Sequence, residues 1–203
     1  VLLIMTDDAG YGVSSTFGGV PVLKEYELLC ELYQQGVRVP KPLAYEGTGS
    51  VFGSPFMLVE KRPGQVIGHM FEMPARNMET CRDVARRLAE IHAVPLDAVG
   101  FVRGAQRGTI DQIKDFLGES LTNYRAMGWP SPLYEAGFDY LQKNIGILER
   151  TRGLVHGDYG LNNVLIHEER VSTILDWEFA HIGNPAYDLG YFYFQVEALG
   201  SWD

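Results

Sequence analysis

Three polar side chains lie within the stretch VHGDYGLNN at residues 155–163, namely His156, Asp158 and Asn163. A fourth, Asp176, follows in LDWE at the end of an apolar run. Because a buried carboxylate without partners is costly, this arrangement calls for a chemical reason. Carboxylate and amide oxygens are hard ligands, which Mg²⁺ takes together with phosphate and water. The spacing therefore predicts a magnesium–phosphate site.

The distance of five residues between Asp158 and Asn163 allows a loop carboxylate and an amide just before a strand to enter one cleft. Asp176, at the end of the partner strand, would add a second carboxylate. Asp158 could bind the metal, or it could accept the proton of an attacking hydroxyl group. The pattern H-x-D-x4-N followed by a metal-binding Asp matches the template for phosphoryl transfer. His156 is expected to pack and orient the loop rather than to bind metal.

A plainer interpretation makes HGD a polar turn and Asp176 the cap of a strand, and for HGD alone this is the better one. The surrounding pattern favours the functional interpretation. Two apolar runs, NVLI and VSTILDW, flank the polar turn HEER, which predicts a β-hairpin with the acids at its mouth. Apolar periodicity predicts helices elsewhere, and short apolar runs predict further strands. The predicted helices cover residues 22–35, 78–92, 110–127 and 133–149, and the predicted strands 1–6, 43–45 and 55–61.

Composition excludes several classes of partner. The formal net charge of −9 argues against binding to nucleic acid or to an anionic membrane surface. No apolar run has the length of a membrane span. The two cysteines, Cys30 and Cys81, do not form a disulfide framework, so a cytoplasmic location is expected.

Three segments, VHGDYGLNNVLI, ILDWEFA and HIGNPAYDLGY, resemble the aminoglycoside phosphotransferase and choline kinase-like family. The nearest likeness is to the branch found beside acyl-CoA dehydrogenase domains. The resemblance runs from about Val22 to the end of the chain. It implies that Asp158 is the catalytic base and that Asn163 and Asp176 bind Mg²⁺. It also implies that Asp188, in NPAYDLG, braces the catalytic loop by hydrogen bonds.

The resemblance extends to the smaller lobe expected for this family. EYELL is similar to the helix whose glutamate pairs with a phosphate-binding lysine, which gives that role to Glu25. PFMLVEKRPG is similar to the last strand of the lobe and the hinge. It implies that Val59 lies beside the adenine of ATP. The carbonyl of Glu60 and the amide of Arg62 would then meet its edge.

The beginning of the chain departs from the family pattern. No Lys or Arg precedes Lys24, so the phosphate-binding lysine is absent and Glu25 has no obvious partner. VLLIMTDDAGYGVSSTFGG instead resembles the first strand of arylsulfatases, where an Asp pair binds metal. A sulfatase nucleophile motif is missing, and Asp7 and Asp8 are expected to end a strand. The chain is also expected to be shorter than the family at its C-terminus.

These observations predict an α+β, protein-kinase-like fold of two lobes. Residues 1–20 would form a foreign sulfatase-like strand and loop, residues 21–62 a reduced N-terminal lobe and hinge, and residues 63–203 a mainly helical C-terminal lobe. Three functions stay open. They are an ATP- and Mg²⁺-dependent kinase for a small hydroxyl substrate, a non-catalytic remnant that acts by binding, and a metal-dependent ester hydrolase.

A shortened small lobe also predicts self-association. Residues 1–5 are apolar and contain no Lys or Pro that would block edge pairing. The lobe is expected to expose core side chains such as Leu28, Leu32 and Met57. Both features predict a homodimer formed through residues 1–35.

Overall fold

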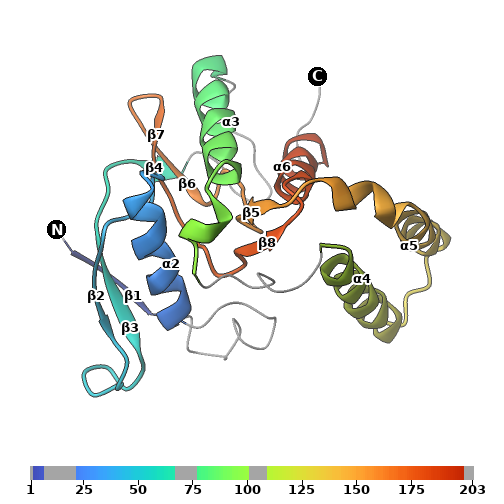
Figure 1. Cartoon of the computed structure of the whole chain (residues 1–203), viewed down its shortest axis with the longest axis horizontal. Coiled ribbons are helices and arrows are strands. Elements are labelled where there is room, and N and C mark those ends of the chain that lie inside the picture. The colour runs from blue at the N-terminus through green and yellow to red at the C-terminus, as the bar shows by residue number, and fades with distance from the viewer. Residues whose placement is uncertain (1, 7–21, 67–76, 101–108, 199–203) are drawn as a thin grey trace.

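The computed structural model describes residues 2–6, 22–66, 77–100 and 109–198. Figure 1 shows a small sheet with one helix at one end of the molecule and mainly helices at the other. The fold is α+β, as the sequence predicts, since helices are combined with three small sheets. The aspartates at positions 7 and 8 lie outside the described residues.

The small lobe contains one antiparallel sheet and one helix. Strand β3 (Phe56–Glu60) lies between β1 (Leu2–Thr6) and β2 (Pro42–Glu46). All five residues of β1 pair with β3, so the sulfatase-like segment supplies an edge strand of this sheet. In the described part of the chain, β1 has a neighbouring strand on one side only.

Helix α2 (Val22–Gln34) packs beside this sheet through the leucines that the helical spacing singles out. Leu28 and Leu32 are 2% and 0% exposed, and Met57 of β3 is 2% exposed. The expectation that these three side chains are exposed is therefore wrong. All three side chains belong to the hydrophobic core that also contains residues of the large lobe. The argument for a dimer from exposed core side chains fails, and only the open edge of β1 supports it.

The large lobe is built on helices and two small sheets. Strand β6 (Val164–His167) pairs with β7 (Arg170–Ile174) in the predicted hairpin, and β4 (Gln65–Val66) joins the other side of β6. Strands β5 (Gly153–Val155) and β8 (His181–Gly183) form a second, two-stranded sheet. The sequence did not predict β4 or β8, because runs of two or three residues carry too little pattern.

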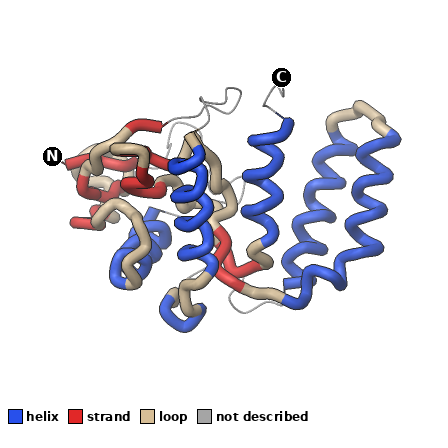
Figure 2. Tube along the Cα trace, turned by 90° about the horizontal axis from the view of Figure 1, so that it is seen from above, coloured by secondary structure: helices blue, strands red, loops and turns tan. Residues whose placement is uncertain are grey.

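Four helices and two short 3-10 turns complete this lobe. Helix α3 (Met78–His92) has the predicted bounds, and the Asn77 side chain caps it by accepting the amides of Glu79 and Thr80. The remaining helices are α4 (Thr109–Ala126), α5 (Pro132–Asn144) and α6 (Ala186–Ala198), with 3-10 turns η1 (Leu96–Ala98) and η2 (Ile145–Arg150). Figure 2 shows α4 and α5 side by side at the end of the molecule opposite the small sheet.

One hydrophobic core spans both lobes. It joins Leu28 of α2 and Val59 of β3 to Ile91 of α3 and Trp177 after β7, all almost fully buried. The two lobes are thus held together where the predicted site lies. Within the described ranges, Cys30 and Cys81 are free thiols. No helix of the described residues is long and apolar enough to cross a membrane.

Candidate active site

The loop between β5 and β6 carries Asp158 and Asn163, and the structure brings these two side chains together. Asn163 Nδ2 donates to Asp158 Oδ2 at 2.7 Å and to the backbone oxygen of Asp158 at 2.9 Å. The Asn163 amide is almost completely buried, whereas the Asp158 carboxylate is partly exposed. The contact fixes one carboxylate oxygen and leaves the other to face solvent or substrate.

The backbone of Asn163 is held as firmly as its side chain. Its amide donates to Gly160 O at 3.0 Å, which closes a turn in the loop. Its carbonyl accepts the amide of Leu175 at 2.8 Å, directly before Asp176. The loop and the end of β7 are therefore adjacent through their backbones, as the sequence predicts for a shared cleft.

His156 is completely buried and orients the loop, as expected. Its ring packs against Trp177, with ring centroids 4.5 Å apart, and edge-on against Tyr159. Nε2 lies 3.0 Å from Leu175 O, and Nδ1 accepts the amide of Asp158 at 3.2 Å. Burial lowers the pKa of His156, so the imidazole is neutral, with its proton on Nε2. A neutral ring with both nitrogens engaged serves as a spacer rather than a metal ligand.

Asp188, at the start of α6, holds the other side of the same loop. Its carboxylate is completely buried and accepts the backbone amides of His156 and Gly157, each at 2.9 Å. His92 Nε2 lies 2.9 Å from the same group. Burial alone raises the pKa of Asp188. The hydrogen bonds from His92 and the two amides outweigh burial, so the pKa lies below its ordinary value.

Gly157 is required by the geometry of this loop. Its φ is +90°, and a Cβ atom there would lie 2.4 Å from Phe179 O. Only glycine fits so close to that carbonyl. The glycine therefore allows its amide to reach Asp188 while the chain turns toward Asp158.

Asp176 has φ of +64°, in the left-handed region that residues other than glycine adopt rarely. The residues on either side hold it there. Leu175 bonds to the catalytic loop through both its amide and its carbonyl. The amide of Trp177 donates to Glu25 Oε1 at 3.4 Å. Such strain, maintained by neighbours on both sides, is typical of functional turns.

Glu25 therefore has a partner, and the expectation that it has none is wrong. The carboxylate contacts the turn that carries Asp176 rather than a lysine of the kind implied by the family resemblance. This contact joins residues 152 positions apart in the chain, so the sequence gives no local signal for it.

The hinge residues lie where the resemblance places them, at the end of β3. Val59 is fully buried in the core, with no exposed surface. The amide of Glu60 donates to Lys41 O at 2.9 Å. The Arg62 side chain turns into a separate cavity. The contacts of these residues with a nucleotide stay a prediction.

Two supporting residues were not assigned to the site from sequence. His92, the last residue of α3, contacts Asp188 through Nε2 at 2.9 Å. Asp83 is completely buried in α3 and accepts the amide of Val171 at 2.8 Å and Arg87 Nη2 at 2.9 Å. Its pKa is lowered, since the bonds from Arg87 and Val171 outweigh the effect of burial. Asp83 is 88 residues from Val171 in the chain, and His92 is 96 residues from Asp188. Only the fold brings each pair together.

The donor set fits a magnesium ion. Within the described residues, no three His, Cys, Asp or Glu side chains form a metal-ligand group. Mg²⁺ needs only one or two carboxylates together with phosphate and water, so Asp176 and the Asn163 amide oxygen suffice. That oxygen accepts Asn162 Nδ2 at 3.0 Å, and its second lone pair stays available.

Comparison with known families matches residues 20–203 to the family described as "Phosphotransferase enzyme family". Among curated proteins, rat acyl-CoA dehydrogenase family member 11 is 29% identical over 186 residues, covering 87% of this chain and 24% of that protein. Viomycin phosphotransferase of Streptomyces vinaceus is 27% identical over 190 residues, covering 82% of this chain and 62% of that protein. The chain thus spans less than a quarter of the length of the first acyl-CoA dehydrogenase family relatives that it matches.

Solved structures show the same fold. A Ralstonia eutropha protein assigned as an aminoglycoside phosphotransferase superposes with a TM-score of 0.69 and 25% identity, covering 86% of this chain and 55% of that one. Aminoglycoside phosphotransferase APH(4)-Ia, crystallised with ADP and hygromycin B, superposes with a TM-score of 0.61 and 20% identity, covering 83% and 60%. The predicted kinase-like fold is confirmed by these neighbours.

Proposed function

The chain belongs to the phosphotransferase enzyme family, and from this membership we propose that it transfers the γ-phosphate of ATP to a hydroxyl group of a small molecule. The relatives named as antibiotic phosphotransferases support a small-molecule acceptor rather than a protein. The single observation that carries the proposal is the 2.7 Å contact from Asn163 to Asp158, on a loop braced by buried groups.

Asp158 is proposed as the catalytic base. Its second carboxylate oxygen accepts the proton of the acceptor hydroxyl while that hydroxyl oxygen forms its bond to the γ-phosphorus. The bond from the γ-phosphorus to the β–γ bridging oxygen breaks, and ADP leaves with that electron pair. Asn163 keeps the Asp158 carboxylate from rotating. His156 and Asp188 hold the loop in the conformation that orients the Asp158 carboxylate.

Asn163 and Asp176 are proposed to hold Mg²⁺. When bound, this ion neutralises charge on the phosphate oxygens. The strained turn at Asp176 directs its carboxylate, and Glu25 stabilises that turn through the Trp177 amide. Val59 and the backbone of Glu60 and Arg62 are proposed to meet the adenine.

The composition of the segment before α2 favours a second candidate, in which the chain binds nucleotide without turnover. No Lys or Arg precedes Lys24 in the sequence. In this candidate the braced loop and the metal ligands would form a binding site for Mg-ATP. The kinase releases ADP, whereas the binding protein does not. The third candidate, a metal-dependent ester hydrolase, would act without ATP.

An assay of ADP release over a panel of hydroxylated acceptors, including aminoglycosides, sugars and hydroxy acids, tests the proposal. We expect at least one acceptor to stimulate ADP release by the wild-type chain and Asp158→Asn to abolish the stimulation. Asp111→Asn, an exposed carboxylate on α4, is the matched control and should behave as wild type. Absence of stimulation in the wild type, or its survival in Asp158→Asn, would contradict the proposal. Nucleotide binding without ADP release would establish the second candidate.

The open edge of β1 supports a further proposal, a homodimer formed through residues 1–35. Unpaired amide and carbonyl groups along an edge strand pair readily with a second copy. Light scattering should give twice the monomer mass, and deletion of residues 1–19 should leave insoluble or unfolded protein. A soluble, folded monomer after that deletion would contradict it.

A further inference from the structure

A cavity of about 670 Å³ lies where the hinge meets the β6–β7 hairpin. Its walls are the end of α2, residues 37–39, the hinge pair Arg62 and Pro63, and the hairpin turn at 167–172. None of Asp158, Asn163 and Asp176 lines it, so it is separate from the candidate active site. Its volume is that of an ordinary small-molecule site.

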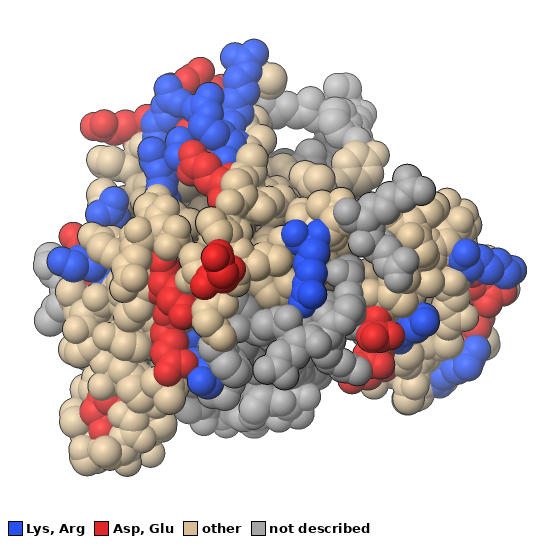
Figure 3. Space-filling view, viewed as in Figure 1, with Lys and Arg blue, Asp and Glu red and all other residues tan. Residues whose placement is uncertain are grey.

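The charge of this cavity is opposite to that of the chain. Three arginines from three different segments line it, Arg38, Arg62 and Arg170, and Glu168 is the one carboxylate in its lining. Behind the lining, Asp83 interacts with Arg38 and Arg170, and Glu79 pairs with Arg170. The chain as a whole carries −9. Figure 3 shows that Lys and Arg also gather over the upper end of α3 and the neighbouring hairpin. The local field there favours an anion.

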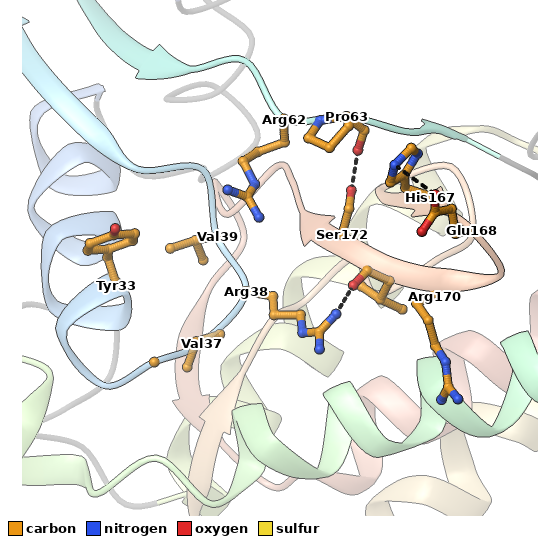
Figure 4. Close-up of a pocket in the computed structure, with 12 residues that line it drawn as sticks. Tyr33, Val37, Arg38, Val39, Arg62, Pro63, His167, Glu168, Arg170 and Ser172 are labelled. Carbon is orange, nitrogen blue, oxygen red and sulfur yellow. Dashed lines mark hydrogen bonds and ion pairs between the residues drawn. The ribbon is translucent and has the colours of Figure 1, made fainter.

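Arg62 has unused hydrogen-bonding capacity. Its Nε atom is buried and has no hydrogen-bond partner, which is costly for a charged group. Nη1 lies 3.5 Å from Glu60 Oε2, but both side chains are more than one third exposed, so the ion pair is weak. Figure 4 shows the Arg62 side chain turned from the hinge into the cavity.

Arg38 faces the same space from the opposite wall. One of its nitrogens, Nη1, donates to Val171 O, and this bond fixes the position of the guanidinium. Arg170 pairs with Glu79 at 2.5 Å and lies 3.7 Å from Asp83, so its charge is already balanced by carboxylates. Two guanidinium groups from different segments thus line one cavity.

We propose that this cavity binds a phosphate group, held by Arg38 and Arg62. The fork of a guanidinium matches phosphate oxygens in a bidentate manner, and a phosphate dianion balances two arginines. The phosphate is either the free ion or the head of a small phosphate ester. Val39, Pro63 and Tyr33 provide an apolar wall for the remainder of such an ester.

A ligand here would reinforce a junction that the structure already makes. Ser172 Oγ donates to Pro63 O at 2.5 Å, which ties the hairpin to the hinge. The carbonyl of Arg38 accepts the amide of Ile174 at 2.7 Å, two residues before Asp176. A phosphate bridging Arg38 and Arg62 would therefore link the hinge to β7, the strand that precedes Asp176.

Titration of the chain with inorganic phosphate, followed by amide chemical shifts at constant ionic strength without Mg²⁺, tests the proposal. We expect saturable shifts at residues 37–39, 62 and 167–172. Arg62→Gln should weaken this binding at least tenfold, because its guanidinium has no other strong partner. Arg125→Gln removes an exposed arginine on α4 that pairs with Glu135, and it should bind phosphate as wild type does.

Two further arms separate the alternatives. Asp176→Asn should leave the shifts at these residues unchanged, since the cavity is distinct from the metal site. Glycerol phosphate binding more tightly than inorganic phosphate would identify an ester as the ligand, and equal or weaker binding would identify the free ion. Absence of saturable shifts at these residues in the wild type, or equal binding by Arg62→Gln, would overturn the proposal.

Discussion

The two lobes contribute to the candidate site in different ways. In the large lobe, His156, Asn163 and Asp188 are buried, and hydrogen bonds fix each of them. The contact that the small lobe makes from Glu25 to Trp177 is 3.4 Å long, at the weak end of the range. The half proposed to accept the proton and to bind metal is thus held by buried hydrogen bonds, while the half proposed to bind the nucleotide departs from the family pattern. We therefore expect binding of the nucleotide phosphates, rather than proton transfer to Asp158, to limit the proposed reaction.

The largest expected effect is on the rigid half. Asp188→Ala should lower the free energy of unfolding by about 3–5 kcal/mol, because two buried amides and His92 lose their shared acceptor. Urea denaturation measures this change. The matched Asp111→Ala, at an exposed position, should change the free energy by less than about 0.5 kcal/mol. A loss below about 1 kcal/mol for Asp188→Ala would show that the loop is not braced as described.

Asp158→Asn should separate catalysis from stability. The acceptor-dependent rate should fall at least about 100-fold, since an amide does not accept the hydroxyl proton. The free energy of unfolding should stay within about 1 kcal/mol of wild type, because the partly exposed side chain can still contact Asn163. ADP release and urea denaturation, measured on the same preparation, check both statements. If Asp158→Asn lowered the free energy of unfolding as much as Asp188→Ala does, Asp158 would be a structural residue like Asp188. That result would contradict the account.

The stability of the rigid half should depend on pH through His156. Its folded-state pKa is lowered by burial, so the unfolded chain binds a proton below about pH 6.5 while the folded chain does not. Stability is therefore fully present above pH 6.5 and is lost as the pH falls toward the folded pKa, by at most about 1.4 kcal/mol per pH unit.

The lowered pKa of Asp188 acts in the same direction at lower pH. Its contribution is present above the ordinary Asp pKa of about 3.9 and is lost as the pH falls further. Urea denaturation between pH 5 and pH 7.5 isolates the histidine, and His156→Gln should flatten the slope in this window. An equal slope in both proteins would assign the titration to another group.

The smallest effect is expected in the small lobe. Glu25→Ala should lower the free energy of unfolding by about 1 kcal/mol, the value of one ordinary hydrogen bond. Glu25→Gln keeps an oxygen that accepts the Trp177 amide and should cost less. Glu27→Ala, which removes a partly exposed ion pair with Lys24, is the matched control, with an expected cost below about 0.5 kcal/mol. Equal losses for Glu25→Ala and Glu27→Ala would show that the 3.4 Å contact contributes nothing specific.

Local spacing predicted the parts of the site that lie close together in the chain. Asp158 and Asn163 are five residues apart, and the hairpin that follows has strong apolar runs on both strands, so their approach could be inferred. Helix α3 was predicted with its bounds because its apolar stripe is a local pattern.

The remaining features depend on contacts that sequence order conceals. His92 reaches Asp188 across 96 residues, and Glu25 reaches Trp177 across 152. The burial of Leu28 and Met57 depends on how the lobes share one core, which no local pattern reports. The cavity around Arg38 and Arg62 likewise arises from three distant segments.

Calorimetric titration with Mg-ATP, and with Mg²⁺ alone, tests the central claim most directly, because it requires no knowledge of the acceptor. The claim is that the braced loop forms a working metal–nucleotide site although residues 1–23 contain no Lys or Arg. We predict that the wild-type chain binds Mg-ATP at one site and that Asp176→Asn weakens this binding at least about tenfold, a loss of about 1.4 kcal/mol. No measurable binding by the wild type, or equal affinity in Asp176→Asn, would contradict the account.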